Sequence, residues 1–150
     1  MMMRVTVLDN ALEIAKIAHK GQTDKGGNDY FTSHIMAVVN AVDGETEKIV
    51  AALHDVIEDT DLTLDDLRYE GFGDEVIEAV EVLTHPKGEP YMDYIKRVGQ
   101  NPIARKVKIA DIQNNMDLSR IPDPTEADHK RVEKYWEALK FLAEITLFYI

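Results

Sequence analysis

One helix-length segment of this chain is apolar on nearly every face and leads directly into a group of ionisable residues. Residues 45–57 carry aliphatic or alanine side chains at almost every position after the first turn, and such a helix is buried. At about 100° per residue, His54 and Glu58 lie about 40° apart, and a second row, Asp55 and Asp59, lies beside them. Because an unpaired buried charge costs several kcal/mol, we expect a compensating partner, and a divalent cation meets this need.

The rest of the chain repeats a pattern of helix, short loop and helix, and no segment alternates convincingly as a strand does. Thr63 is placed to cap one helix with Asp66 reaching back, and Asp123-Pro124 to start another with Glu126 in the reciprocal position. The expected fold is all-α, a compact helical bundle formed by residues 1–150 as one domain. Helices are expected near residues 8–20, 32–42, 45–57, 63–70, 74–83, 90–99, 102–118 and 124–148.

The composition argues against several classes of function. The net charge of −11 repels the phosphate backbone, so we expect a small-molecule partner and no nucleic acid. No apolar run approaches the roughly eighteen residues of a membrane span, and residues 1–7 do not resemble a signal peptide. The absence of cysteine fits a reducing cytoplasm and leaves His, Asp, Glu and Asn as metal ligands. The oligomeric state is unknown from these features.

Two further segments place a polar group in an apolar helix. His34 opens the helix near 32–42, and Asp111 lies within the apolar run 107–112, with Asn115 one turn later on the same face. We therefore expect three helices to direct His34, the His54-Asp55 pair and Asp111 towards one centre. Adjacent His and Asp ligands suit an octahedral Mn²⁺, Fe²⁺ or Mg²⁺ better than a tetrahedral zinc site.

Each of these residues also has a plainer interpretation. His34 fits a helix-start histidine, Asp111 a structural acid paired with Lys or Arg, and Glu58-Asp59 a solvated helix end. Their joint occurrence favours the metal site. His19 is expected to cap the first helix through its charge, and Trp136 is expected to lie in the core.

Together these motifs resemble the HD-domain superfamily, and within it the hydrolase domain of Rel/SpoT alarmone enzymes and their small stand-alone relatives. The resemblance is carried over about residues 10–121 by five segments. They are Ala18-His-Lys-Gly-Gln22, Tyr30 before His34, Ala51-Ala-Leu-His-Asp-Val-Ile-Glu-Asp-Thr60, Val107-Lys-Ile-Ala-Asp111 and Asn115-Met116.

The resemblance implies a Mn²⁺-dependent 3′-pyrophosphohydrolase acting on (p)ppGpp. By that likeness the metal ligands are His34, His54, Asp55 and Asp111. Glu58 and Asp59 match the acidic pair that positions or activates water. The expected substrate contacts are Lys25, Tyr30, Lys108 and Asn115.

The chain departs from the family pattern around the nucleotide base. Asp24 stands where the family usually has an Arg that helps to hold guanine, and Leu118 replaces a Thr that contacts nucleotide. Between Tyr30 and His34 there is one residue more than in the usual Pro-Tyr-Ile-x-His-Pro. Two alternatives therefore stay open: a phosphatase on another nucleotide or a dinucleotide cofactor, and a metal-bearing interaction domain without turnover.

Overall fold

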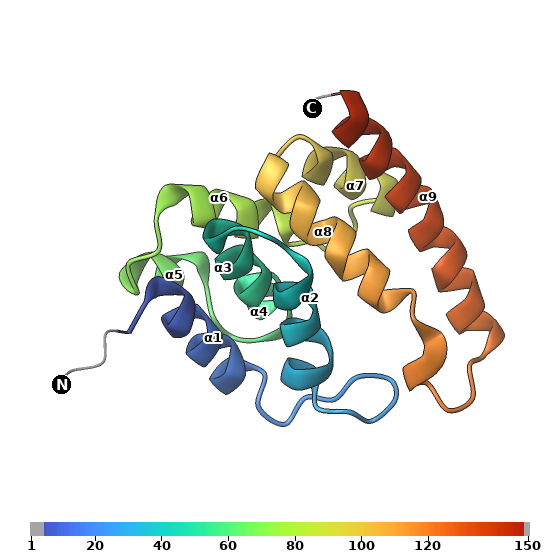
Figure 1. The fold of residues 1–150 in the computed structure, drawn as a ribbon, viewed down its shortest axis with the longest axis horizontal. Coiled ribbons are helices and arrows are strands. Elements are labelled where there is room, and N and C mark those ends of the chain that lie inside the picture. Colours follow the sequence, from blue (N-terminus) through green and yellow to red (C-terminus); the bar gives the residue numbers. More distant parts are fainter. Residues whose placement is uncertain (1–4, 149–150) are drawn as a thin grey trace.

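The computed structural model describes residues 5–148, and their regular structure is helical throughout, as predicted (Figure 1). The α-helices are α1 Val7–Ala18, α2 Met36–Ala41, α3 Glu45–Leu53, α4 Val56–Asp59, α5 Leu64–Tyr69, α6 Asp74–Leu83, α7 Tyr91–Gly99, α8 Pro102–Asn115 and α9 Glu126–Phe148. A π-helical turn, η1 Phe31–Ile35, precedes α2, and a 3-10 turn, η2 Leu118–Arg120, follows α8. No described helix is long and apolar enough to cross a membrane.

Helix α3 lies at the centre of the bundle, as its apolar sequence predicts. It packs against α1, α2, α6 and α8, while α9 covers α7 and α8 on the side away from α1 (Figure 1). The five residues from Ile49 to Leu53 are all buried, so α3 contributes a continuous stretch of apolar surface to the core. The ionisable residues that follow α3 therefore begin inside the bundle.

The predicted helix 45–57 is broken at His54 and Asp55, which differs from the continuous helical face that the sequence suggested. Asp55 has φ −106° and ψ −1°, and α4 begins at Val56. The His54 Nδ1–H donates to the Ala51 carbonyl oxygen at 2.5 Å, a local bond that competes with regular helix geometry. The directions of Glu58 and Asp59 therefore do not follow from the helical rotation of α3.

The predicted helix near 32–42 begins as a π turn. The Met36 N–H bonds to the Phe31 carbonyl, which adds one residue to the turn. This turn accommodates the extra residue between Tyr30 and His34. The rings of Tyr30 and His34 lie next to each other, with their centroids 5.1 Å apart. The insertion therefore leaves His34 directed into the protein interior.

Helix capping follows the sequence in one place and differs in another. The predicted capping box between Thr63 and Asp66 is present, and the structure shows a further cap at α8, where Asn101 precedes Pro102. At α9 the predicted start was wrong, because Thr125 and Asp128 cap each other instead. The prediction of a core position for Trp136 was also wrong, since that side chain is 55% exposed.

A pair of substitutions tests this description of the core. Leu53→Ala should lower the free energy of unfolding by about 2–5 kcal/mol, because it opens a cavity around a fully buried side chain. Trp136→Ala should change it by less than about 0.5 kcal/mol, because the indole is largely in solvent. Urea denaturation measures both, and equal effects would contradict the placement of the two side chains.

Candidate metal centre

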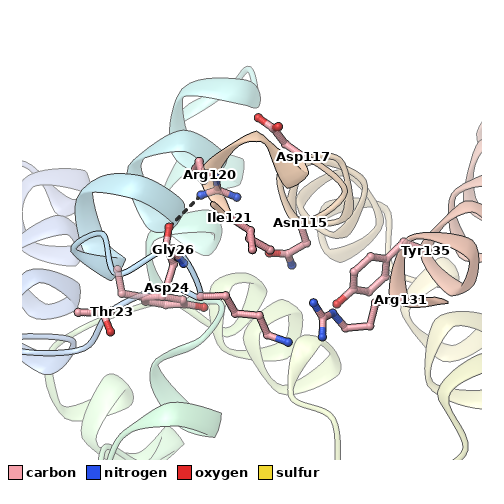
Figure 2. Close-up of a pocket in the computed structure, with 11 residues that line it drawn as sticks. Thr23, Asp24, Gly26, Asn115, Asp117, Arg120, Ile121, Arg131 and Tyr135 are labelled. Carbon is pink, nitrogen blue, oxygen red and sulfur yellow. Dashed lines mark hydrogen bonds and ion pairs between the residues drawn. The ribbon is translucent and has the colours of Figure 1, made fainter. Parts of the chain in front are cut away.

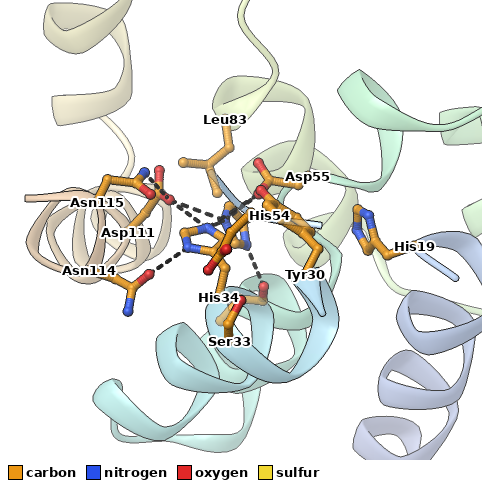
Figure 3. Close-up of polar contacts among 12 residues, drawn as sticks. His19, Tyr30, Ser33, His34, His54, Asp55, Leu83, Asp111, Asn114 and Asn115 are labelled. Atoms are coloured by element: carbon orange, nitrogen blue, oxygen red, sulfur yellow. Dashed lines mark hydrogen bonds and ion pairs between the residues drawn. The ribbon is translucent and has the colours of Figure 1, made fainter. Parts of the chain in front are cut away.

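Four residues that the sequence singled out converge on one buried point, reached from η1, the α3–α4 break and α8 (Figure 3). One ligand atom from each lies within 4.8 Å of the others. The His34 Nε2 atom is 2.9 Å from Asp111 Oδ1 and 3.3 Å from His54 Nε2. The His54 Nε2 atom is 3.1 Å from Asp55 Oδ2. We call His34, His54, Asp55 and Asp111 the His–Asp cluster.

The cluster holds two imidazoles between two carboxylates, and their charges perturb one another. Burial alone would lower the pKa of His34, but hydrogen bonds to Asp111 and Asp55 outweigh burial and raise that pKa to about 9. Burial likewise opposes a raised pKa at His54, yet the pKa rises well above its ordinary value because of both carboxylates. The two imidazoles lower the pKa of Asp55, and Lys108 together with the imidazoles lowers the pKa of Asp111, so both carboxylates stay ionised although burial favours the neutral acids.

Each cluster residue is also held by a second contact. His54 donates through Nδ1 to the Ala51 carbonyl, so its Nε2 atom faces the centre. The Tyr30 hydroxyl donates to Asp55 Oδ2 at 2.5 Å. Asp111 receives Lys108 Nζ at 2.9 Å and Asn115 Nδ2 at 3.1 Å. Such outer contacts orient metal ligands in proteins.

The donor set fits a divalent cation. Two ligands at right angles around an ion with bonds of about 2.1 Å lie about 3 Å apart, and the closest pairs of cluster atoms have this spacing. Two imidazole nitrogens and two carboxylate oxygens suit an octahedral Mn²⁺ or Fe²⁺, with further positions left for water or substrate. The cluster could thus hold a catalytic metal.

Two hollows flank the cluster and share Tyr135 of α9. The first, the Asp24 hollow, has a volume of about 270 Å³ and lies between the loop 21–29, the end of α8 and α9 (Figure 2). The second, the Glu58 hollow, has a volume of about 190 Å³ and includes His54, Asp55 and Asp111 in its wall. Basic side chains line both, namely Lys25, Arg120 and Arg131 in the first and Lys108 and Lys134 in the second.

No protein-family model matches the chain, but individual proteins do. The chain is 39% identical over 93 residues to human MESH1, which is named guanosine-3′,5′-bis(diphosphate) 3′-pyrophosphohydrolase. The aligned region covers 58% of this chain and 51% of MESH1. The chain is 30% identical to a probable GTP pyrophosphokinase of Mycobacterium leprae over 95% of this chain and 19% of that protein. It is 37% identical to the bifunctional (p)ppGpp synthase/hydrolase SpoT of Escherichia coli over 79% of this chain and 17% of SpoT. The chain thus spans about half of MESH1 and a fifth or less of the other two.

A solved structure described as a metazoan orthologue of SpoT that hydrolyses ppGpp matches the fold with a TM-score of 0.75. The match covers 97% of this chain and 88% of the other, at 22% sequence identity. The chain is related to the Rel/SpoT-type HD-domain hydrolases. The HD-domain fold predicted from the sequence is therefore confirmed.

Within this HD domain, the predicted acidic pair is divided between two surfaces. Glu58 borders the Glu58 hollow and accepts a hydrogen bond from the His85 backbone N–H. Asp59 instead lines a separate outer groove beside Gln22. Partial burial and the nearby carboxylates of Asp55 and Glu58 raise the pKa of Asp59 to about 6. The two residues are consecutive in α4, and consecutive side chains of a helix point about 100° apart, so they face different surfaces.

The predicted substrate contacts also differ in their placement. Asn115 and Lys25 line the Asp24 hollow, and the Lys25 side chain is 60% exposed, with Nζ 3.8 Å from Asp128. Tyr30 lines the same hollow while its hydroxyl is engaged by Asp55. Lys108 lies in the wall of the Glu58 hollow rather than in solvent.

The expected role of His19 was wrong. Burial lowers its pKa, so the ring is neutral near pH 7 and cannot cap α1 through a charge. Its Nδ1–H donates to Gln22 Oε1 at 2.8 Å, and the Gln22 amide donates to the Asp59 carbonyl at 3.1 Å. This buried pair joins the end of α1 to the end of α4.

Sequence reasoning missed the residues that α9 and η2 bring to the hollows, namely Arg120, Arg131, Lys134 and Tyr135. Three of them lie within five residues on α9, and the spacing of Arg131 and Tyr135 places both on one helix face. A basic and an aromatic side chain on one helix face were the sequence pattern that could have indicated this contribution of α9 to the hollows.

Metal binding should release protons. Both cluster histidines have a raised pKa and are protonated at pH 7.5 in the metal-free protein, whereas a metal requires neutral imidazoles. We expect about two protons to be released on Mn²⁺ binding, and a higher affinity as the pH rises towards 9 because fewer protons are displaced. Calorimetry in buffers of different ionisation enthalpy measures this. A binding enthalpy that does not depend on the buffer would contradict it.

Proposed function

We propose that this domain, residues 1–150, is a metal-dependent phosphohydrolase that releases the 3′-pyrophosphate of (p)ppGpp. The observation that carries the proposal is the His–Asp cluster, which forms part of the wall of the Glu58 hollow and contacts Tyr30 and Asn115 of the Asp24 hollow. Basic side chains line both hollows, although the net charge of the chain is −11. The activities after which MESH1 and SpoT are named support this substrate class. We propose Mn²⁺ as the metal and, because the chain lacks cysteine, a cytoplasmic location.

In this proposal the four cluster residues hold the metal. A divalent metal held there would lower the pKa of a bound water and would neutralise charge that develops on phosphorus. Glu58 borders the same hollow as His54 and Asp55 and is placed to accept the proton of the attacking water. In this proposal Asp59, which lines the neighbouring groove, is the second carboxylate of the acidic pair.

The two hollows divide the substrate between them. Lys134 is the basic residue available to bind phosphate, because it forms no ion pair with a carboxylate among the described residues. Its Nζ atom lies 4.3 Å from the centre of the Tyr91 ring. It faces the Glu58 hollow together with Lys108, so we assign the scissile pyrophosphate to that side. The Asp24 hollow, with Asn115 and Arg131, takes the nucleoside.

Hydrolysis of ppGpp by purified protein with Mn²⁺, beside Asp55→Ala, tests the proposal directly. Pyrophosphate released by the wild-type protein alone supports both the site and the reaction. No release of pyrophosphate would overturn the choice of substrate, and a panel of 2′- and 3′-phosphorylated nucleotides and dinucleotides would then test the first alternative. Tight Mn²⁺ binding without turnover on any of them would favour an interaction domain.

Glu58→Gln should lower kcat about 10²- to 10⁴-fold, because the variant cannot accept a proton, while Mn²⁺ affinity stays near the wild-type value. Asp59→Asn is the matched control, and its smaller loss reflects a side chain outside the Glu58 hollow. Steady-state kinetics and calorimetry measure the two quantities. Retained turnover in Glu58→Gln would rule out this residue as the base.

Lys134→Met should lower kcat/KM for ppGpp about 10- to 100-fold, because it removes a charge-assisted contact of about 1.5–3 kcal/mol to phosphate. The control is Lys130→Met on the same helix, where Lys130 is exposed and lies 3.8 Å from Glu126. This control removes the same charge outside both hollows. Equal kinetic effects of the two substitutions would show that only net charge matters.

A further inference from the structure

Arg120 joins the wall of the Asp24 hollow to the back of the His–Asp cluster. Its Nη1 donates to the Ser33 carbonyl oxygen at 3.0 Å, next to His34 in η1. Its Nη2 donates to both the backbone oxygen and the side-chain Oδ1 of Asn114, at 2.9 and 3.1 Å. One guanidinium therefore connects η2, η1 and the end of α8.

These contacts determine the orientation of the Asn114 amide. A guanidinium has donors only, so the amide must present its oxygen, and not its NH₂ group, to Arg120. The same Oδ1 atom lies 2.7 Å from His34 Nδ1, so that nitrogen must carry the proton. A neutral His34 then has its lone pair on Nε2, the atom that faces the cluster.

Asp24 holds the other side of Arg120. Its Oδ2 lies 3.5 Å from Arg120 Nη1, as the dashed line in Figure 2 shows. Its Oδ1 accepts the backbone N–H groups of Gly26 and Asn28, each at 2.9 Å. The loop also touches η2 directly, because a Cβ at Gly26 would lie 1.9 Å from the Arg120 carbonyl oxygen.

Asp24 stands where the family resemblance places a base-binding arginine. Its carboxylate is engaged by its own loop and by Arg120, and its side chain is only 12% exposed. It is therefore a fixed part of the wall of the hollow, with both carboxylate oxygens already engaged.

We infer that Asn114 and Arg120 are positioning residues that hold His34 in its metal-binding tautomer, and that Asp24 ties the nucleotide-side loop to this unit. The inference rests on the proposed metal centre, but it concerns metal affinity and does not depend on the identity of the nucleotide. Outer-shell partners of this kind change metal affinity when they are removed.

Calorimetry with MnCl₂ alone tests the role of Asn114. Asn114→Leu removes the acceptor and should weaken Mn²⁺ binding about 10- to 100-fold, whereas Asn114→Asp keeps an acceptor and should bind about as tightly as wild type. Nitrogen NMR of the His34 imidazole supplies a second readout. At high pH without Mn²⁺, we expect Nδ1 to carry the proton in the wild type and a mixture of the two tautomers in Asn114→Leu. Circular dichroism checks that both variants are folded. Wild-type affinity in Asn114→Leu would overturn the inference.

The role of Asp24 is tested by Asp24→Arg, which restores the residue typical of the family. We expect weaker Mn²⁺ binding, because the new cation repels Arg120. Asp123→Arg is the control, since it makes the same charge change at an exposed residue outside both hollows, and its Mn²⁺ affinity should not change. Unchanged affinity in Asp24→Arg would overturn the link to the loop. If these differences in affinity appear but no nucleotide is hydrolysed, the inference stands and the proposed function fails.

Discussion

Two imidazoles and two carboxylates buried within a few ångströms of each other are the constraint on which the rest of this structure depends. Four such groups cannot all keep their ordinary ionisation in an apolar core. Without metal, protonated histidines alternate with ionised aspartates, and with metal the cation takes the place of the protons. The buried α3, the π turn and α8 are the scaffold that carries these groups to one point.

The same point organises the surface around it. Basic residues from the loop 21–29, η2, α8 and α9 line hollows on two sides of the cluster, although the chain as a whole is acidic. A local field of this kind, strengthened by a bound cation, offsets the repulsion that the net charge exerts on phosphate. The overall charge therefore bears on macromolecular partners more than on a small phosphorylated ligand. The relationship to MESH1 and SpoT agrees with that distinction.

The helical fold could be predicted from the sequence. So could the convergence of four side chains, because each is a polar group in an otherwise apolar helix: His34, His54, Asp55 and Asp111. The direction of Glu58 and Asp59 could not, since helical periodicity assumes an unbroken helix and the chain breaks at His54. The contributions of Arg120, Arg131 and Lys134 depend on how η2 and α9 fold back over α8, a tertiary contact that leaves no local pattern. The contacts of Asp24 likewise become clear only when Arg120 is seen beside it.

The central claim is that the His–Asp cluster is a metal site, and anomalous diffraction at the manganese edge tests it most directly. Crystals soaked in MnCl₂ should show a strong peak about 2.2 Å from Nε2 of His34 and His54 and from a carboxylate oxygen of Asp55 and Asp111. A peak at other residues, or none at the cluster, would contradict the account.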